Sequence, residues 1–507
     1  MLLSELATTD GVVSATRSRL AKVDAISQLL GRLDRDEVAP ALGLLIGSPV
    51  QSRLGVGWRS LTGMSVPAAD APTLTVGSVD DLLSRLAMTE GTGSAAARTS
   101  VLVELMSAAT APEQAFLVRV LLGEMRTGAL EGVLVDAIAR AAQVPGEAVR
   151  RAVMLSGSLG ETAVLALFEG SDALARVSLT VGRPVRPMLA SSEPTVAQAL
   201  GVTGEASVEY KLDGARIQVH RRGDEVRIFT RSLAEVTHRL PEVAEAVRRL
   251  PLRDAIFDGE TLTLDEEGAP RPFQQTMSRF GADASRAALL SPWFFDVLHL
   301  DGRDLIDEPL STRREILRQV APEFLIPGVI TDDREVAEAL SVEALAKGHE
   351  GVVVKAIGSP YTAGRRGSSW VKVKPVHTYD LVVLACEWGS GRRRGWLSNL
   401  HLGAYDPEGE FGEPGGFVMV GKTFKGLTDE LLRWQTERFQ QIEVRHTAGT
   451  VWVEPITVVE IAIDGVQASP RYPGGIALRF ARVKRYRDDK LPAEADTIQT
   501  LRALLRS

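Results

Sequence analysis

The chain is organised around the stretch Ser207-Val208-Glu209-Tyr210-Lys211-Leu212-Asp213-Gly214-Ala215-Arg216-Ile217-Gln218-Val219-His220. Apolar residues alternate with polar ones on both sides of Asp213-Gly214, and Asp-Gly is a strong turn signal because it tolerates positive φ. The pattern therefore predicts a single β-hairpin, with Lys211 at a strand end where its amine can point into a cleft. A lone Lys-x-Asp-Gly is more often a solvated lysine on a strand edge, so its meaning depends on the rest of the chain.

Four further stretches place charged residues beside apolar strands. They are Phe257-Asp258-Gly259-Glu260, predicted at a strand end and turn; Phe294-Phe295-Asp296; Glu350-Gly351-Val352-Val353-Val354-Lys355; and Trp370-Val371-Lys372-Val373-Lys374, whose two lysines share one face of a strand. Taken singly, such acids are usually turn residues and such lysines usually face water. Together they supply an amine nucleophile, carboxylates for a metal and cations for a polyphosphate, which is the set that nucleotidyl transfer needs.

Length and composition limit the class of protein. The 507 residues suffice for about three domains, and 45% hydrophobic with 24% charged residues is typical of a soluble globular protein. A net charge of −7 argues against a uniformly basic nucleic-acid coat but not against a local basic face. Such a face is indicated between Gly351 and His401, where eight lysines and arginines stand against two acids.

The single cysteine, Cys386, excludes an internal disulfide framework and any cysteine-rich zinc site. The N-terminus lacks the pattern of a signal peptide, and no uncharged apolar run reaches the roughly 18 residues that a membrane span needs. These features predict a cytoplasmic protein without a transmembrane helix.

The periodicity of apolar residues divides the chain into three parts. Helical spacing runs from the N-terminus to about Leu179, with a helix start predicted at Thr110-Ala111-Pro112. Two prolines in the connector 181–190 mark one boundary, and Lys374-Pro375 marks a second. We therefore predict a multidomain α+β protein: an all-α domain over 1–180, an α+β domain over 181–375, and a small β-barrel over 376–507, with an OB-fold the leading candidate.

One motif argues for a different chemistry. The stretch Gly416-Phe417-Val418-Met419-Val420-Gly421-Lys422-Thr423 satisfies the Walker A pattern of a phosphate-binding loop. A phosphate loop needs a flexible turn that leads into a helix, whereas Phe417 to Val420 read as a hydrophobic strand. We therefore predict a strand here and no P-loop.

In their order along the chain, the motifs that begin with Lys211-Leu212-Asp213-Gly214 resemble those of the covalent nucleotidyltransferases, the superfamily of DNA ligases, RNA ligases and mRNA-capping enzymes. The stretch Arg479-Phe480-Ala481-Arg482-Val483-Lys484-Arg485-Tyr486-Arg487-Asp488-Asp489-Lys490 is similar to the last motif of ATP-dependent DNA ligases. With the helical N-terminal region, the resemblance covers nearly the whole chain and implies a multidomain ligase of the archaeal and eukaryotic type that some bacteria share. Ala481 departs from the proline of many members, which leaves the local backbone less fixed.

The resemblance implies a role for each matching residue. Lys211 would form the lysyl-AMP, and because the reference pKa of a lysine is about 10.4, burial, a bound metal, Lys372 and Lys374 would have to lower the pKa of its ammonium. The other implied site residues are Glu209 at the adenine and Phe295 stacked on it; Arg216 and Arg231 at ribose or nick phosphate; Glu260 and Glu350 at ribose and divalent metal; Arg366, Lys372 and Lys374 at phosphates; and Arg482, Arg487, Asp489 and Lys490 of the C-terminal domain during the first step.

The implied enzyme is an ATP-dependent DNA ligase that uses ATP and Mg²⁺ or another divalent metal. A helical DNA-binding domain, an adenylation domain and an OB-fold domain would close as a monomeric clamp around nicked duplex DNA, with Lys374-Pro375 as the hinge. Two alternatives stay open. An RNA ligase or capping-type nucleotidyltransferase shares the lysine chemistry, although the large helical region argues against it, and a catalytically inactive DNA-binding scaffold would retain the fold alone.

Overall fold

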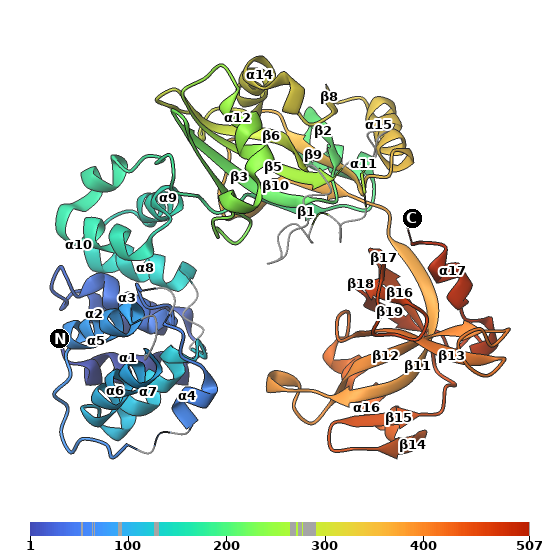
Figure 1. The fold of residues 1–507 in the computed structure, drawn as a ribbon, viewed down its shortest axis with the longest axis horizontal. Coiled ribbons are helices and arrows are strands. Elements are labelled where there is room, and N and C mark those ends of the chain that lie inside the picture. Colours follow the sequence, from blue (N-terminus) through green and yellow to red (C-terminus); the bar gives the residue numbers. More distant parts are fainter. Residues whose placement is uncertain are drawn as a thin grey trace.

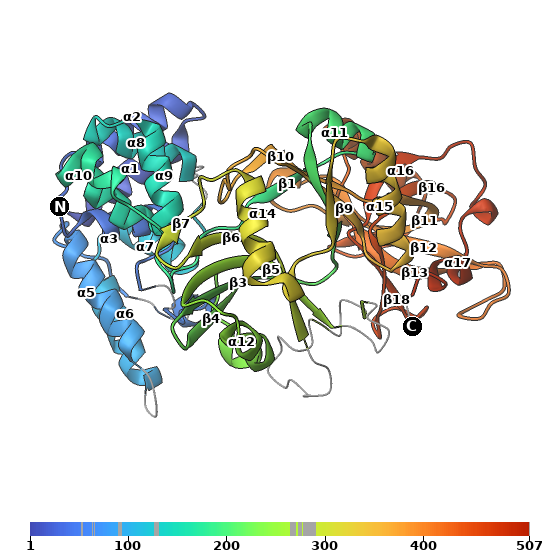
Figure 2. The same ribbon diagram turned by 90° about the horizontal axis from the view of Figure 1, so that it is seen from above.

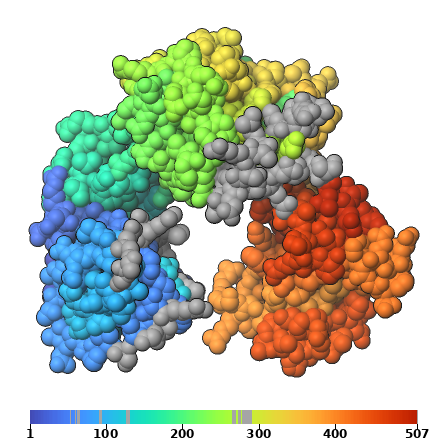
Figure 3. All heavy atoms as spheres, viewed as in Figure 1, coloured from blue at the N-terminus to red at the C-terminus, as the bar shows by residue number. Residues whose placement is uncertain are grey.

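The computed structural model describes residues 1–51, 54–62, 64, 66–89, 94–125, 131–263, 270–271, 276 and 290–505 of the chain. The elements form three lobes that follow one another along the sequence and lie in an arc (Figure 1). In the space-filling view the lobes surround a central opening (Figure 3). Among the described residues, no helix is both long and apolar enough to cross a membrane.

The N-terminal lobe is helical. Its elements are α1 (Leu3–Ala15), α2 (Arg19–Leu30), α3 (Val38–Ile46), α4 (Trp58–Thr62), α5 (Val76–Met88), α6 (Ser94–Ser107), α7 (Ala111–Leu121), α8 (Glu131–Ala142), α9 (Gly146–Ser156) and α10 (Leu159–Ala175). The helix start predicted at Thr110 is confirmed, because Thr110 and Glu113 form a capping box that satisfies free backbone amides at the start of α7. Apolar residues on the inner faces of these helices, among them Leu6, Leu29 and Phe116, share one buried core.

The central lobe contains two five-stranded sheets with the strand orders β1-β10-β9-β2-β8 and β4-β3-β5-β6-β7. The strands are β1 (Leu189–Ser192), β2 (Ala206–Lys211), β3 (Ala215–Arg222), β4 (Glu225–Thr230), β5 (Asp254–Thr263), β6 (Leu290–Leu300), β7 (Arg303–Asp304), β8 (Gly328–Thr331), β9 (Gly351–Ala356) and β10 (Arg366–Val373). Helices α11 (Val196–Thr203) and α15 (Arg334–Ala346) pack on the first sheet, while α12 (Pro241–Arg248) and α14 (Leu310–Val320) cover the second (Figure 2). One core, which includes Val208, Leu298 and Val354, joins the two sheets.

The predicted hairpin at Asp213-Gly214 is wrong. β2 pairs with β8 and β9, whereas β3 pairs with β4 and β5, so the chain crosses from one sheet to the other at this turn. Gly214 does not have a positive φ; instead, a Cβ at this position would lie 2.5 Å from the Thr261 carbonyl oxygen. The glycine is therefore required by the close approach of β5 and not by hairpin geometry.

The strand end predicted at Phe257-Asp258-Gly259-Glu260 is also wrong. These residues lie in the middle of β5, between β3 and β6. A Cβ at Gly259 would lie 2.5 Å from the Trp293 carbonyl oxygen, so the two strands can approach here only because the residue is glycine. Acids and a glycine that read as a turn in the sequence are accommodated inside a sheet by tertiary contacts.

The C-terminal lobe is a bent antiparallel sheet with one long helix, α16 (Asp429–Gln441), and a short one, α17 (Ile498–Arg502). Its strands are β11 (His377–Trp388), β12 (Leu397–Asp406), β13 (Gly416–Thr423), β14 (Glu443–His446), β15 (Thr450–Val453), β16 (Val458–Ile463) and β19 (Arg482–Tyr486), with β17 (Gly465–Ala468) and β18 (Ile476–Arg479) forming a separate pair. Within the described part of the chain, no strand pairing closes this sheet into a barrel. The strand predicted in place of a P-loop is confirmed as β13, which is paired along its length with β12.

Candidate active site

Lys211 is the last residue of β2 and lies where three strands of the first sheet meet. It pairs with Gly351 at the start of β9, and the Glu350 backbone amide donates a hydrogen bond to the Lys211 carbonyl oxygen at 2.9 Å. Gly351 has a φ of 136°, and a Cβ there would lie 2.3 Å from the Val373 carbonyl oxygen of β10. Glycine thus allows β10 to approach and fixes the position of the lysine at the end of the sheet.

Three carboxylates surround the Lys211 amine. Lys211 forms an ion pair with Glu350, and Glu260 and Asp213 add negative charge nearby. Burial lowers the pKa of the Lys211 ammonium, but Glu350, Glu260 and Asp213 outweigh it, and the net pKa is raised. The electrostatic field at Lys211 therefore differs from the one that the sequence predicted, since acids and not cations dominate around its amine.

Glu260 is the second acid beside the amine, and it lies on β5 of the other sheet. Its carboxylate accepts a hydrogen bond from the Gly214 backbone amide at 3.0 Å. Burial raises the pKa of Glu260 to about 7, against the opposing effects of Lys211, Gly214 and Arg216. The Asp213-Gly214 crossing between the sheets thus brings Lys211 and Glu260 to one place.

Cations of β10 form the opposite side of the site. The side chains of Lys372 and Lys374 lie on one face of the strand, with Arg366 at its exposed beginning. Burial lowers the pKa of Lys372, and the positive charges of Lys374, Lys211 and Arg366 lower it further. The positive charges of these residues therefore act on one another, as expected of a site for an anionic ligand.

A further network that sequence reasoning missed lies beneath the site. Arg216 of β3 makes a bidentate ion pair with Asp258 at 3.1 and 2.7 Å, and the Tyr361 hydroxyl donates a hydrogen bond to Asp258 at 2.6 Å. Arg216 also donates to the Met188 carbonyl oxygen at 2.7 Å. Asp258 belongs to a stretch that the sequence marks as charged, but Tyr361 carries no motif and is found only from the fold.

Glu209 and Phe295 are both largely buried. The Glu209 carboxylate is bound by Arg314 of α14 and by Lys355 of β9. The Lys355 amine lies 4.3 Å from the centre of the Phe295 ring and 4.2 Å from that of Trp370. The residues expected at the adenine therefore adjoin one another, together with Lys355, which ends one of the sequence motifs, and Arg314, which the sequence gave no reason to select.

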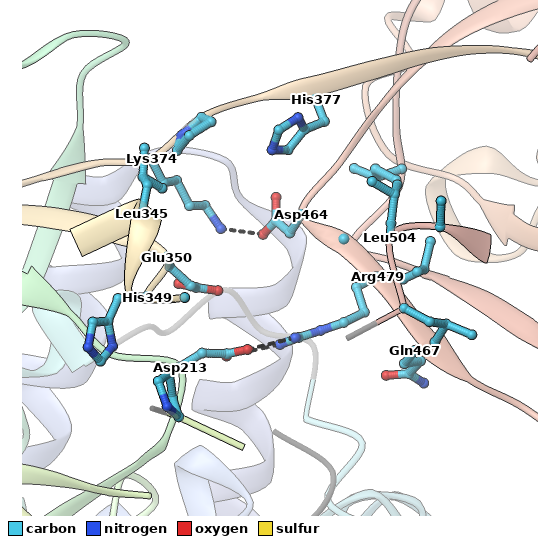
Figure 4. A pocket seen from close by; sticks show the side chains of 18 of the residues that line it. Asp213, Leu345, His349, Glu350, Lys374, His377, Asp464, Gln467, Arg479 and Leu504 are labelled. Atoms are coloured by element: carbon cyan, nitrogen blue, oxygen red, sulfur yellow. Dashed lines mark hydrogen bonds and ion pairs between the residues drawn. The ribbon is translucent and has the colours of Figure 1, made fainter. Parts of the chain in front are cut away.

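Between the central and C-terminal lobes, a cavity of about 560 Å³ opens beside these groups (Figure 4). Two ion pairs cross it: Arg479 binds Asp213 at 2.8 and 3.1 Å, and Lys374 binds Asp464 at 2.5 Å. Asp213 follows Lys211 by two residues, so the C-terminal lobe reaches the candidate site directly. Arg479 stands in the last motif, but the sequence gave no role to it.

The other implied residues of the last motif do not line this cavity. Arg482 binds Asp464 at 3.0 Å, while Arg487 and Lys490 bind Asp380 of β11 at 2.9 and 2.6 Å. Arg487 also binds Asp489. Arg231 is exposed in the turn after β4. In this arrangement the structure brings together the predicted site residues of the central lobe except Arg231, but not those expected from the C-terminal lobe.

Glu260 and Glu350 meet the requirements of a divalent metal only in part. In the described ranges, no three acidic, histidine or cysteine side chains are grouped closely enough to hold a metal alone. Mg²⁺ commonly binds one or two protein carboxylates and completes its shell with water and substrate phosphates. The two glutamates beside Lys211 fit that donor set.

A lysine amine flanked by carboxylates and cations, near a cavity between a two-sheet lobe and a β lobe, is the arrangement expected of a covalent nucleotidyltransferase. Three family models match the chain: DNA ligase N terminus over residues 60–139, ATP dependent DNA ligase domain over 187–374, and ATP dependent DNA ligase C terminal region over 393–490. Probable DNA ligases of Pseudarthrobacter chlorophenolicus and Rhodococcus opacus are 69% and 56% identical, and each match covers 100% of both chains. The chain belongs to the ATP-dependent DNA ligase family.

Solved structures agree on the fold. Those named Pmar-Lig_Pre and Pmar-Lig_PreS3 match with TM-scores of 0.64 and 0.62 at 19% and 18% identity, and each covers 95% of this chain and 99% of its own. These structures support the fold alone, and the family matches identify the protein as an enzyme, an ATP-dependent DNA ligase.

Proposed function

We propose that Lys211 is the nucleophile with which this ligase seals nicks in duplex DNA. The observation that carries the proposal is the convergence on its amine of Glu260, Glu350 and the cations of β10, at a cavity between two lobes. The amine attacks the α-phosphorus of ATP, a P–N bond forms and pyrophosphate leaves. AMP then passes to the 5′-phosphate of the nick, and the 3′-hydroxyl displaces it as the phosphodiester forms.

The ammonium must first lose its proton, and the carboxylates that raise its pKa oppose that loss. We assign Glu260 and Glu350 as the residues that would hold Mg²⁺ or another divalent cation. When bound, the cation supplies positive charge that offsets both the phosphates and these carboxylates. Lys372, Lys374 and Arg366 would bind phosphate oxygens, and the ion pair of Lys374 with Asp464 would open to release that lysine.

For the nucleoside, we assign Glu209 to the adenine and Phe295 to the face of the base. Arg216 would act at the ribose or the nick phosphate, although its bidentate pair with Asp258 makes it less free than its motif suggests. Arg231 is exposed and unpaired in the described part of the chain, which suits a phosphate contact outside the nucleotide pocket.

Nicked duplex DNA would occupy the opening between the lobes, with 1–180 as the DNA-binding domain, 181–375 as the adenylation domain and 376–507 as an OB-fold domain. An exposed aromatic and basic surface on the C-terminal lobe supports this. Phe424 and Phe480 are 55% and 57% exposed, and the Lys425 amine lies 5.6 Å from the Phe480 ring. Phe480 has a φ of 53°, which is rare for a bulky residue and is typical of functional sites.

A clamp of this kind needs only one chain, so we propose a cytoplasmic monomer.

The test is self-labelling followed by sealing. Incubation with ATP labelled at the α-phosphate should leave label on the denatured chain, and the labelled enzyme should then join a nicked DNA duplex. A duplex with RNA on both sides of the nick should be joined much less. Absence of labelling would support an inactive scaffold, labelling without joining would indicate a different acceptor, and preferential joining of RNA would identify an RNA ligase.

A further inference from the structure

Asp464 lies at the boundary between the central and C-terminal lobes, where the chain passes from β16 to β17. Its backbone amide donates a hydrogen bond to the Arg479 carbonyl oxygen at 3.0 Å. Its side chain lines the cavity and faces Lys374 (Figure 4), and only 11% of it is exposed. The backbone therefore holds this carboxylate in one place beside the candidate site.

Each oxygen of the Asp464 carboxylate binds a cation from a different lobe. Oδ2 binds the amine of Lys374, directly after β10, at 2.5 Å, and Oδ1 binds Nη2 of Arg482 on β19 at 3.0 Å. We assign Lys374 to a phosphate, and the resemblance gives Arg482 a role in the first step of the reaction. A carboxylate that bridges the two offers a pair of anionic oxygens, as a phosphate group does.

Asp380 of the C-terminal lobe binds two cations in a different way. Its partners Arg487 and Lys490 belong to the same lobe, so this group moves as one body. The pair of Asp464 with Lys374 instead crosses the lobe boundary at a cavity, where a competing anion can enter. Displacement of Asp464 from Lys374 would therefore also free the C-terminal lobe from the end of β10.

The charge of Asp464 also acts on the next cation of the cluster, Lys372. Burial lowers the pKa of Lys372 and neighbouring cations lower it further, whereas the negative charge of Asp464 opposes them. One carboxylate thus offsets part of the repulsion among cations that we assign to phosphates. A polyphosphate has more anionic oxygens than a carboxylate and would compete with Asp464 for the same cations.

We propose that Asp464 competes with pyrophosphate for Lys374 and Arg482, and thereby protects the lysyl-AMP from the reverse reaction. In that reaction an oxygen of pyrophosphate attacks the phosphorus of the lysyl-AMP, a P–O bond forms and the P–N bond breaks, so that ATP and the lysine amine are restored. After pyrophosphate leaves in the forward direction, Asp464 recaptures both cations and returns the C-terminal lobe to the arrangement seen here. ATP must displace the same carboxylate before it binds. The inference rests on the proposed role of Lys211.

Three measurements test the inference together. They are the KM for ATP in self-labelling, the pyrophosphate concentration at which loss of label from the adenylylated protein is half-maximal, and the rate of joining of a nick that already carries 5′-AMP. Asp464→Asn keeps the shape of the side chain and removes its charge. We expect it to lower both concentrations about fivefold, as for removal of one competing ion pair. Joining should slow about threefold, because Lys374 no longer holds the C-terminal lobe.

Three further variants make the test decisive. Asp464→Ser is a second uncharged variant and should act in the same directions if Asp464→Asn folds poorly. Asp464→Glu keeps the charge and should stay closer to the wild-type protein in all three measurements. Glu460→Gln is the matched control on β16: it removes an acid that pairs with Arg485 inside the C-terminal lobe, and should change none of them. Thermal unfolding measures the stability of each variant.

The opposite signs of the effects distinguish this role from simpler ones. A loss of stability would impair labelling and joining together, and a general loss of negative charge would favour ATP and DNA alike; either result would overturn the inference. An unchanged dependence on pyrophosphate in both uncharged variants would overturn it as well. If the wild-type protein took no label, the proposed function would be wrong and the inference would fail with it.

Discussion

At the scale of single residues, the groups around Lys211 favour its charged ammonium form, whereas nucleophilic attack requires the neutral amine. Burial lowers the pKa of the ammonium, but the carboxylates of Glu350, Glu260 and Asp213 outweigh it, so the net pKa is raised. A protonated lysine is not a nucleophile, so the resting arrangement is inactive until negative charge near the amine is offset. The substrate and its metal would thereby activate the group that attacks them.

The first prediction concerns the nucleophile itself. Lys211→Ala should abolish the covalent adduct, and Lys211→Arg should do the same, because a guanidinium does not lose its proton in proteins. Label on the denatured chain measures the adduct. As a control, Lys422→Ala changes the lysine of the Walker-like strand, which pairs with Glu387 far from the cavity lining, and should leave labelling intact. Label retained by both Lys211 variants would mean that another residue carries the nucleotide.

At the scale of elements, the crossing at Asp213-Gly214 joins two sheets and sets the distance between Lys211 and Glu260. It depends on Gly214, where a Cβ would meet the Thr261 carbonyl oxygen, and on Gly351, where one would meet that of Val373. Backbone groups cannot swing aside as a flexible side chain can. These glycines therefore determine the geometry of the site although they carry no chemistry.

Gly214→Ala should accordingly lower both stability and activity. We expect a loss of about 1–3 kcal/mol in the free energy of unfolding from overpacking, and a marked drop in the rate of self-labelling as the strands move apart. Urea unfolding and labelling rates measure the two effects. Gly201→Ala is the control: it lies in α11 with no atom within 4 Å of the new Cβ, and should stabilise the helix by up to about 1 kcal/mol with unchanged labelling. If the two variants had the same stability and the same labelling rate, the close approach of β5 to Gly214 would not be what requires glycine at that position.

The connector before β1 is held by another element, β3. His220 Nδ1 accepts a hydrogen bond from the Gly182 backbone amide at 2.9 Å. The side-chain amide of Gln218 accepts a hydrogen bond from the Val185 backbone amide through Oε1 and donates one to the Val185 carbonyl oxygen through Nε2. Burial lowers the pKa of His220 to about 3, with smaller effects of Arg227 and His299 in the same direction. The imidazole is neutral in the folded protein and anchors the connector in that form.

This anchoring predicts a dependence of stability on pH. The unfolded protein binds a proton at this histidine below about pH 6.5, whereas the folded protein binds one only near pH 3. The free energy of unfolding should therefore fall as the pH falls between these values, by at most about 1.4 kcal/mol per pH unit. Urea unfolding at pH 7.5, 6.5 and 5.5 measures the slope. His220→Gln should make the slope shallower, while His238→Gln, at an exposed position, should not. An unchanged slope in His220→Gln would show that other groups cause it.

At the scale of the whole molecule, the two lobe boundaries differ in strength. The N-terminal lobe is attached through the bidentate pair of Arg151 with Asp307 and through Leu155 and Leu179, which belong to the core of the central lobe. The C-terminal lobe is attached by ion pairs across a cavity, Arg479 with Asp213 and Lys374 with Asp464. Ion pairs exchange partners at little cost, whereas a shared core does not, so we expect the C-terminal lobe to be the part that moves.

That motion predicts separate effects on the steps of the reaction. Arg487 and Lys490 bind Asp380 here and can reach pyrophosphate only if the C-terminal lobe turns about Lys374-Pro375. Replacing both by alanine should slow lysyl-AMP formation by about a hundredfold, as for loss of charge stabilisation in a transition state. Joining of a nick that already carries 5′-AMP should suffer much less, because pyrophosphate is no longer involved.

The control for this pair is Arg485→Ala, which lies on β19 two residues before Arg487 and is paired with Glu460; it should change neither step. Thermal unfolding checks for the stability lost when Asp380 is left without its cations. Equal losses in both reactions would mean that the two residues serve DNA binding or stability, and the account of lobe closure would be wrong.

The sequence by itself determined the family, the order of the three parts and the residue types of the site, because nucleotidyl transfer needs an amine, acids and cations that remain visible as local motifs. It also determined the strand at Gly416–Thr423, since a continuous apolar run and the absence of a helix directly after it are local properties. It misjudged Asp213-Gly214 and Phe257–Glu260, which read as turns. Whether such residues lie in a turn or inside a sheet depends on which strands approach them, and that is a property of the tertiary structure.

Only the tertiary structure decided the partners of the site residues. Tyr361 reaches Asp258 across 103 positions, Arg314 reaches Glu209 across 105, and Arg479 reaches Asp213 across 266. No local pattern marks these contacts, because a side chain that supports another needs only the right length and charge at one point in space. The balance of charge at Lys211 was likewise decided by folding, since burial and three acids from separate strands and turns act on it at once.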